Sequence, residues 1–88
     1  GEEFFIIMPN CTPHQASVVA ERIRSSLEKD MTSGHKITAS LGISTYGFSK
    51  GPEEPLDEIL EKLIEQSDQA LYQAKDKGKN RVQHFSSI

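Results

Sequence analysis

Hydrophobic and polar residues follow patterns that change from one part of this chain to the next, and each change predicts an element. Residues Glu3 to Met8 form an almost continuous apolar run, which is typical of a strand covered on both faces. Thr12-Pro13-His14-Gln15 then predicts the start of a helix. It offers a hydroxyl cap, a proline at the first helical position and a glutamine placed for a capping box.

The helix that follows has a buried side and a solvent side. Small and aliphatic residues recur at helical spacing and predict the buried stripe, which consists of Ala16, Val19, Ala20, Ile23 and Leu27. Arg22, Arg24 and Glu28 are expected to face solvent. The pattern predicts that this helix ends near residues 29–31, before Ser33-Gly34.

Strict alternation marks residues Lys36 to Tyr46 as a second strand. One of its faces is mostly aliphatic, whereas the other carries only the small residues Thr38, Ser40, Gly42 and Ser44. A face of small side chains indicates that something packs close to it, either a helix or a ligand.

The last third of the chain predicts a long helix and a short strand. The inner side of the helix is expected to carry Leu56, Ile59, Leu60, Leu63, Ile64, Ala70, Leu71 and Ala74. Gly78 is placed to cap its C-terminus, and Arg81 to Phe85 is expected to form the strand. The order strand, helix, strand, helix, strand predicts an α/β (α+β) fold with helices on a mixed sheet.

Composition and charge exclude some classes of function. The chain has 88 residues, so it forms one small domain at most. Its net charge of -3 gives no overall attraction to nucleic acid or to anionic membrane, and we expect neither as a partner of this segment. Cys11 is the single cysteine, which favours a reducing, cytoplasmic location, although an upstream region could anchor a parent protein to a membrane.

Two strings of residues carry candidate chemistry. The chain opens with Gly1-Glu2-Glu3-Phe4, and Ala70-Leu71-Tyr72-Gln73-Ala74-Lys75-Asp76-Lys77-Gly78-Lys79-Asn80-Arg81-Val82 nearly closes it. In this order and separation they resemble the second half of a GGDEF domain, the catalytic module of diguanylate cyclases. The resemblance implies a partial ferredoxin-like, nucleotidyl cyclase palm fold. It also implies that residues 1–88 are the C-terminal part of a single GGDEF domain whose N-terminal half is absent.

Glu2 and Glu3 are the candidate metal ligands. Mg²⁺ is usually bound by one or two carboxylates together with substrate phosphate oxygens, although a pair of solvated turn carboxylates is the simpler interpretation. In the family that the chain resembles, the position of Glu2 is the catalytic, metal-binding acid, and that of Glu3 supports the metal. The resemblance therefore implies Mg²⁺ or Mn²⁺ at Glu2 and Glu3.

Lys75, Lys77, Lys79 and Arg81 form a dense basic cluster. Cations in the last turn of a helix complement its dipole, and this structural role is one interpretation. Nucleic-acid binding is less convincing because the cluster has little aromatic interleaving. The resemblance implies a sharper role, in which Lys75 and Lys79 bind the triphosphate of GTP. Lysine at the second position would act as a point charge, where the family often has arginine.

Arg22 is a candidate for a second, inhibitory site. Some diguanylate cyclases bind their product through an arginine at the corresponding position of this helix, and the resemblance implies the same for Arg22. The Arg-x-x-Asp motif that completes such a site would lie before Gly1, outside this chain. An arginine on the polar side of an amphipathic helix is otherwise simply solvated.

The family reaction condenses two GTP molecules into the second messenger cyclic di-GMP. It takes place between two domains that face one another, so a homodimer is expected, either through the domain or through exposed strand edges. The 88-residue chain alone is expected to be inactive, because the family's other half supplies a further metal aspartate and the residues that read guanine. Two alternatives stay open: a degenerate GGDEF domain that senses a nucleotide or cyclic di-GMP, and a purely structural or dimerising segment.

Overall fold

The computed structural model describes residues 3–30, 32, 34, 37–47 and 54–87. Two helices and two short strands follow one another along the chain in the order α1 (Pro13–Lys29), β1 (Leu41–Ile43), α2 (Leu56–Asp76) and β2 (Val82–His84), and a 3-10 turn, η1 (Phe85–Ser87), closes the described part. In these described ranges, no helix is long and apolar enough to cross a membrane.

The two strands form a parallel pair that is joined through α2. Leu41 lies opposite Val82, and Ile43 lies opposite His84. Parallel neighbours need a crossover connection, which α2 supplies. The expected order of elements from α1 onward is thus confirmed, and the α/β mixture fits part of a palm fold. In the described residues the sheet is a parallel pair rather than a mixed sheet.

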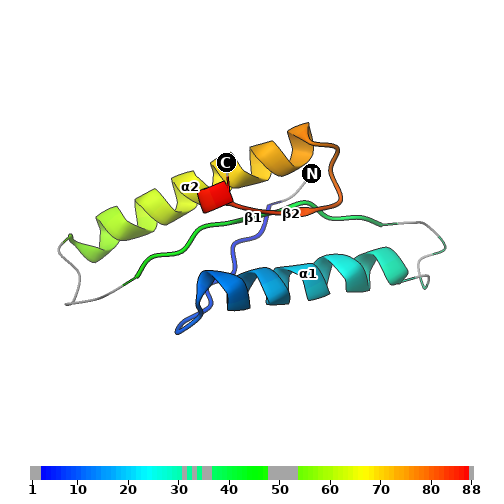
Figure 1. Cartoon of the computed structure of the whole chain (residues 1–88), viewed down its shortest axis with the longest axis horizontal. Helices are drawn as coiled ribbons and strands as arrows, with labels where there is room; N and C mark the ends of the chain where they lie inside the picture. The colour runs from blue at the N-terminus through cyan, green and yellow to red at the C-terminus, as the bar shows by residue number, and fades with distance from the viewer. Residues whose placement is uncertain (1–2, 31, 33, 35–36, 48–53, 88) are drawn as a thin grey trace.

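The strand pair lies between the two helices (Figure 1). On one side, Ala16 and Ala20 of α1 pack with Ile43 in a cluster that also includes Met8 and Leu41. On the other side, α2 lies against the face of small residues. A Cβ atom on Gly42 would stand 2.2 Å from the backbone oxygen of Ser67. A helix, rather than a ligand, therefore covers this position.

Local sequence signals set the helix ends. The Thr12 hydroxyl accepts a hydrogen bond from the Gln15 amide at 3.1 Å, and the Thr12 amide donates to the Gln15 side chain at 2.9 Å. This reciprocal pair is the expected capping box. The C-terminus of α1, at Lys29, also lies where the pattern placed it.

The expected first strand, Glu3 to Met8, is not formed. The side chains of Phe4, Phe5, Ile6 and Ile7 are 58–81% exposed, and only Met8 at the end of the run joins the core. The prediction that both faces of this run are covered was wrong. An apolar run becomes a strand only where a neighbouring strand accepts its backbone hydrogen bonds, and no strand among the described residues does so here.

The inner side of α2 is narrower than the sequence indicated. Ile59, Ala70 and Ala74 are buried, but Leu56, Leu60 and Ile64 are exposed. The exposed three recur every fourth residue, so they form one row along the helix beside the buried stripe. A sheet of two short strands is too narrow to cover both rows.

Candidate functional site

The C-terminus of α2 builds the turn that carries the candidate phosphate-binding lysines. The Lys79 amide donates to the Ala74 carbonyl at 3.0 Å, and the Gly78 amide donates to the Lys75 carbonyl at 3.3 Å. These two bonds make a complete Schellman cap. Gly78 has a φ of 120°, a conformation that favours glycine, so the predicted cap is confirmed.

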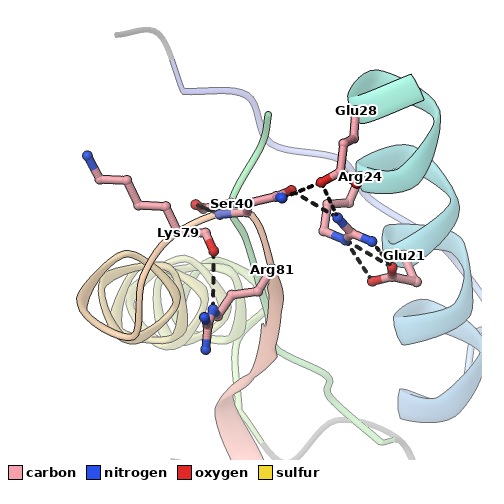
Figure 2. Close-up of polar contacts among 7 residues, drawn as sticks. Glu21, Arg24, Glu28, Ser40, Lys79 and Arg81 are labelled. Carbon is pink, nitrogen blue, oxygen red and sulfur yellow. Dashed lines mark hydrogen bonds and ion pairs between the residues drawn. The ribbon is translucent and has the colours of Figure 1, made fainter. Parts of the chain in front are cut away.

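Two of the four cations in the basic cluster are held by neighbouring groups. The Lys77 ammonium donates to the Gln83 side-chain oxygen at 3.0 Å, and the Arg81 Nε donates to the Lys79 carbonyl at 3.2 Å. The side chains of Lys75 and Lys79 are exposed and form no hydrogen bond or ion pair with the described residues. In Figure 2 the Lys79 side chain extends away from Arg24. The two lysines chosen from the sequence are thus the two members of the cluster whose side chains have no such contact with the described residues.

A polar network joins this turn to α1, and sequence reasoning missed it. Arg24 Nη1 donates to the Asn80 side-chain oxygen at 2.9 Å and to Glu28 Oε2 at 3.2 Å. Asn80 Nδ2 donates to the same Glu28 oxygen. The Asn80 amide donates to the Ser40 hydroxyl at 3.2 Å, so the network also reaches the chain just before β1.

Within this network, Arg24 also forms an ion pair with Glu21. Arg24 Nε donates to both carboxylate oxygens of Glu21, at 2.9 and 3.0 Å (Figure 2). The hydrogen bond from Arg24 lowers the pKa of the Glu21 carboxyl below its ordinary value, and the same bond raises the pKa of Arg24. The Arg24 side chain is only 17% exposed. The expectation that Arg24 faces solvent was wrong, because its guanidinium group turns toward Asn80.

The candidate metal ligands are described only in part. Glu2 lies outside the described residues. Glu3 is exposed, and its carboxylate offers the hard oxygen donors that Mg²⁺ or Mn²⁺ accepts. Across the described ranges, no three His, Cys, Asp or Glu side chains gather into a metal-binding group. The residues fit an ion that is held by one or two carboxylates and a substrate, rather than an all-protein site.

Arg22 lies on the exposed surface of α1. Together with Glu21, Ser25 and Ser26 it lines a shallow surface hollow. It lies only two residues from Arg24, yet it takes no part in the network with Asn80. Its exposure is compatible with a ligand contact and equally with simple solvation.

Comparison with known proteins places this chain in a family. Residues 1–81 match the family described as diguanylate cyclase, GGDEF domain. The chain belongs to this family, as the two sequence strings implied.

Curated relatives agree with that assignment. The chain is 41% identical to diguanylate cyclase A of Treponema denticola, over 93% of its own length and 21% of the relative's. It is 37% identical to diguanylate cyclase DosC of Escherichia coli K12, over 94% and 17% of the two lengths. An uncharacterized Bacillus subtilis protein, YhcK, is 34% identical over 93% and 22%. The chain thus spans about a fifth of the length of these relatives. The search of solved structures gave no match.

Proposed function

We propose that this chain forms the phosphate- and metal-binding part of a diguanylate cyclase domain, which condenses two GTP molecules into cyclic di-GMP. The observation that carries the proposal concerns Lys75 and Lys79 at the capped end of α2: their ammonium groups are exposed and have no hydrogen-bond or ion-pair partner among the described residues. Membership of a family described as diguanylate cyclase supports the same activity. The lysines are proposed to bind the triphosphate as two point charges.

Glu2 is the proposed catalytic carboxylate and, with Glu3, the proposed ligand of Mg²⁺ or Mn²⁺. When bound, such an ion neutralises charge on the phosphates and assists attack by a hydroxyl group. Lys75 and Lys79 would hold the phosphates in line for that attack, since positioning and electrostatics supply most of the rate of phosphoryl transfer. Arg22 is proposed to contact the cyclic dinucleotide product at a second site.

Two such domains are proposed to face each other as a homodimer, each contributing one GTP. The 88-residue chain by itself is proposed to be inactive. Its candidate residues account for one side of the metal site and for the phosphates, but none of them reads guanine. Misplacing a reacting group by as little as about 1 Å can cost roughly a hundredfold in rate.

Replacement of single lysines tests the proposal in the protein at its full natural length. Lys75→Ala and Lys79→Ala should each lower kcat/KM for GTP about 10- to 100-fold, as expected for loss of a charge-assisted contact. Lys77→Ala is the matched control. It removes the same charge from the same turn, but this ammonium already donates to Gln83. We expect it to change kcat/KM by no more than about twofold, within the range of a surface substitution.

Product formation is measured as cyclic di-GMP released from GTP with Mg²⁺. Glu2→Ala should abolish it in the full-length protein, and the 88-residue chain should form none above its own Glu2→Ala variant. If Lys77→Ala is as damaging as Lys79→Ala, the phosphate assignment fails. If the full-length protein binds cyclic di-GMP but forms none, the sensor alternative replaces the cyclase.

A further inference from the structure

The turn that carries Lys79 has an unusual backbone. Three consecutive residues, Gly78, Lys79 and Asn80, have positive φ angles of 120°, 65° and 47°. Glycine takes this conformation readily, but Lys79 pays a steric cost for it and asparagine a smaller one. A non-glycine residue keeps such a conformation only where its surroundings over-determine it.

Asn80 connects this turn to neighbouring segments by hydrogen bonds. Its side-chain oxygen accepts from Arg24 at 2.9 Å, its side-chain nitrogen donates to Glu28, and its backbone amide donates to Ser40 at 3.2 Å. Three hydrogen bonds from two separate segments, α1 and the chain just before β1, therefore fix this one residue. Arg24 is in turn clamped between Glu21 and Glu28, one turn to either side on α1.

We propose that Arg24 and Glu28 are positioning residues for the phosphate-binding turn. By holding Asn80 they keep Lys79 in its left-handed conformation, with its ammonium group on the side of the turn that faces away from Arg24 (Figure 2). Neither residue touches phosphate in this role. The inference rests on the proposed function for Lys79 and adds to it the reason why a helix on the other side of the sheet contributes to the site.

Replacing Glu28 distinguishes an effect of its charge from an effect of its contact with Asn80, because the two predict opposite changes in phosphate affinity. A carboxylate near a phosphate site repels the ligand, so an effect through charge alone predicts that Glu28→Ala tightens phosphate binding. Loss of the clamp predicts that the same change weakens binding, because Lys79 is no longer held. Arg24 is less informative, since removing its positive charge weakens binding in either case.

The experiment measures the dissociation constant for inorganic tripolyphosphate, with Mg²⁺, in the protein at its full natural length. This probe carries the phosphates but has no hydroxyl group to react. Glu28→Ala should raise the dissociation constant about three- to tenfold, the range expected for a residue that acts through others. Glu28→Gln should restore most of the affinity, because its amide oxygen can still accept from Asn80.

Glu54→Ala is the matched control. This substitution removes the same negative charge. The ion pair of Glu54 with Lys62, at 2.7 Å, lies near the N-terminal end of α2, whereas the turn with Lys79 follows its C-terminal end. We expect an unchanged dissociation constant. If Glu28→Ala does not fold, Asn80→Gly provides the second variant. It accommodates the left-handed backbone without strain, releases the clamp and should weaken binding to a similar extent.

The outcomes separate the two proposals. Unchanged or tighter binding in Glu28→Ala, or in Asn80→Gly where it is needed, overturns the positioning role alone if Lys79→Ala weakens binding. Failure of Glu28→Gln to restore affinity also overturns the positioning role. If the wild-type protein does not bind tripolyphosphate, or if Lys79→Ala binds as well as wild type, the proposed function fails and takes the positioning role with it.

Discussion

Two arginines on one helix face different surroundings, although they lie only two positions apart. Arg22 is exposed, whereas Arg24 reaches across to Asn80, 56 residues further along the chain. The sequence does offer the local pairs, since Glu21 and Glu28 lie three and four residues from Arg24. No local spacing encodes the link to Asn80. Sequence reasoning therefore singled out the exposed lysines as candidates but missed the network of Arg24 and Glu28 with Asn80.

The Glu21–Arg24 pair makes stability depend on pH. Because Arg24 lowers the pKa of Glu21 in the folded state below its ordinary value of 4.5, the unfolded state binds more protons at acid pH. The stabilisation is present above pH 4.5 and is lost as the pH falls through the lowered pKa. Glu21→Gln should therefore reduce the free energy of unfolding at pH 7, and the difference from wild type should shrink at more acid pH.

Urea unfolding at several pH values measures this difference. The control is the same substitution in an Arg24→Met background, where the donor is gone and the cost of Glu21→Gln should no longer depend on pH. If Glu21→Gln, with Arg24 present, lowers the free energy of unfolding by the same amount at pH 7 and at acid pH, the pair does not act through protonation of Glu21.

At the scale of elements, helices could be predicted more fully than strands. Thr12 and Gly78 carry their own signals, because a capping hydroxyl and a left-handed glycine act on residues within one turn. The segment Glu3 to Met8 has a composition suited to a strand, but no described residue pairs with it, and no local residue can supply a partner. Of the described part of the alternating run, residues 37–46, only Leu41–Ile43 is paired, over the length of β2.

Gly42 sets the distance between β1 and α2. An alanine Cβ there would lie 2.2 Å from the Ser67 backbone oxygen and 2.3 Å from the Leu71 amide nitrogen. Both atoms belong to the helix backbone, so α2 would have to move as a unit. Gly42→Ala should lower the free energy of unfolding by about 1–3 kcal/mol, as overpacking usually does, or by more.

Gly47→Ala is the control, because a Cβ at this position meets no atom of the described residues within 4 Å. Its effect should stay within about 0.5 kcal/mol. Denaturant unfolding of both variants provides the comparison. Equal stabilities for Gly42→Ala and wild type would mean that α2 does not pack on β1 at this distance.

As a whole, the molecule is more extended than its length requires. Its radius of gyration is 14.2 Å, whereas a compact chain of this length is expected to have about 12 Å. The helices enclose two short strands, and the apolar run at Phe4 to Ile7 stays outside the core. From α1 onward, the order of the helices and strands could be predicted from the sequence. The width of the sheet could not, because it depends on which strands are present to pair.

An exposed apolar run and the two edges of a two-stranded sheet both favour association with another chain. We therefore expect the 88-residue chain to self-associate as its concentration rises, which sedimentation velocity measures directly. Replacing Phe4 and Ile7 by lysine should suppress association, because charge on an exposed edge opposes strand pairing. Leu56→Lys is the control, since Leu56 is an exposed apolar residue that belongs to α2 and not to the N-terminal run. If Leu56→Lys alone prevents association, the helix surface is the contact. A wild-type chain that stays monomeric at all concentrations would contradict the prediction altogether.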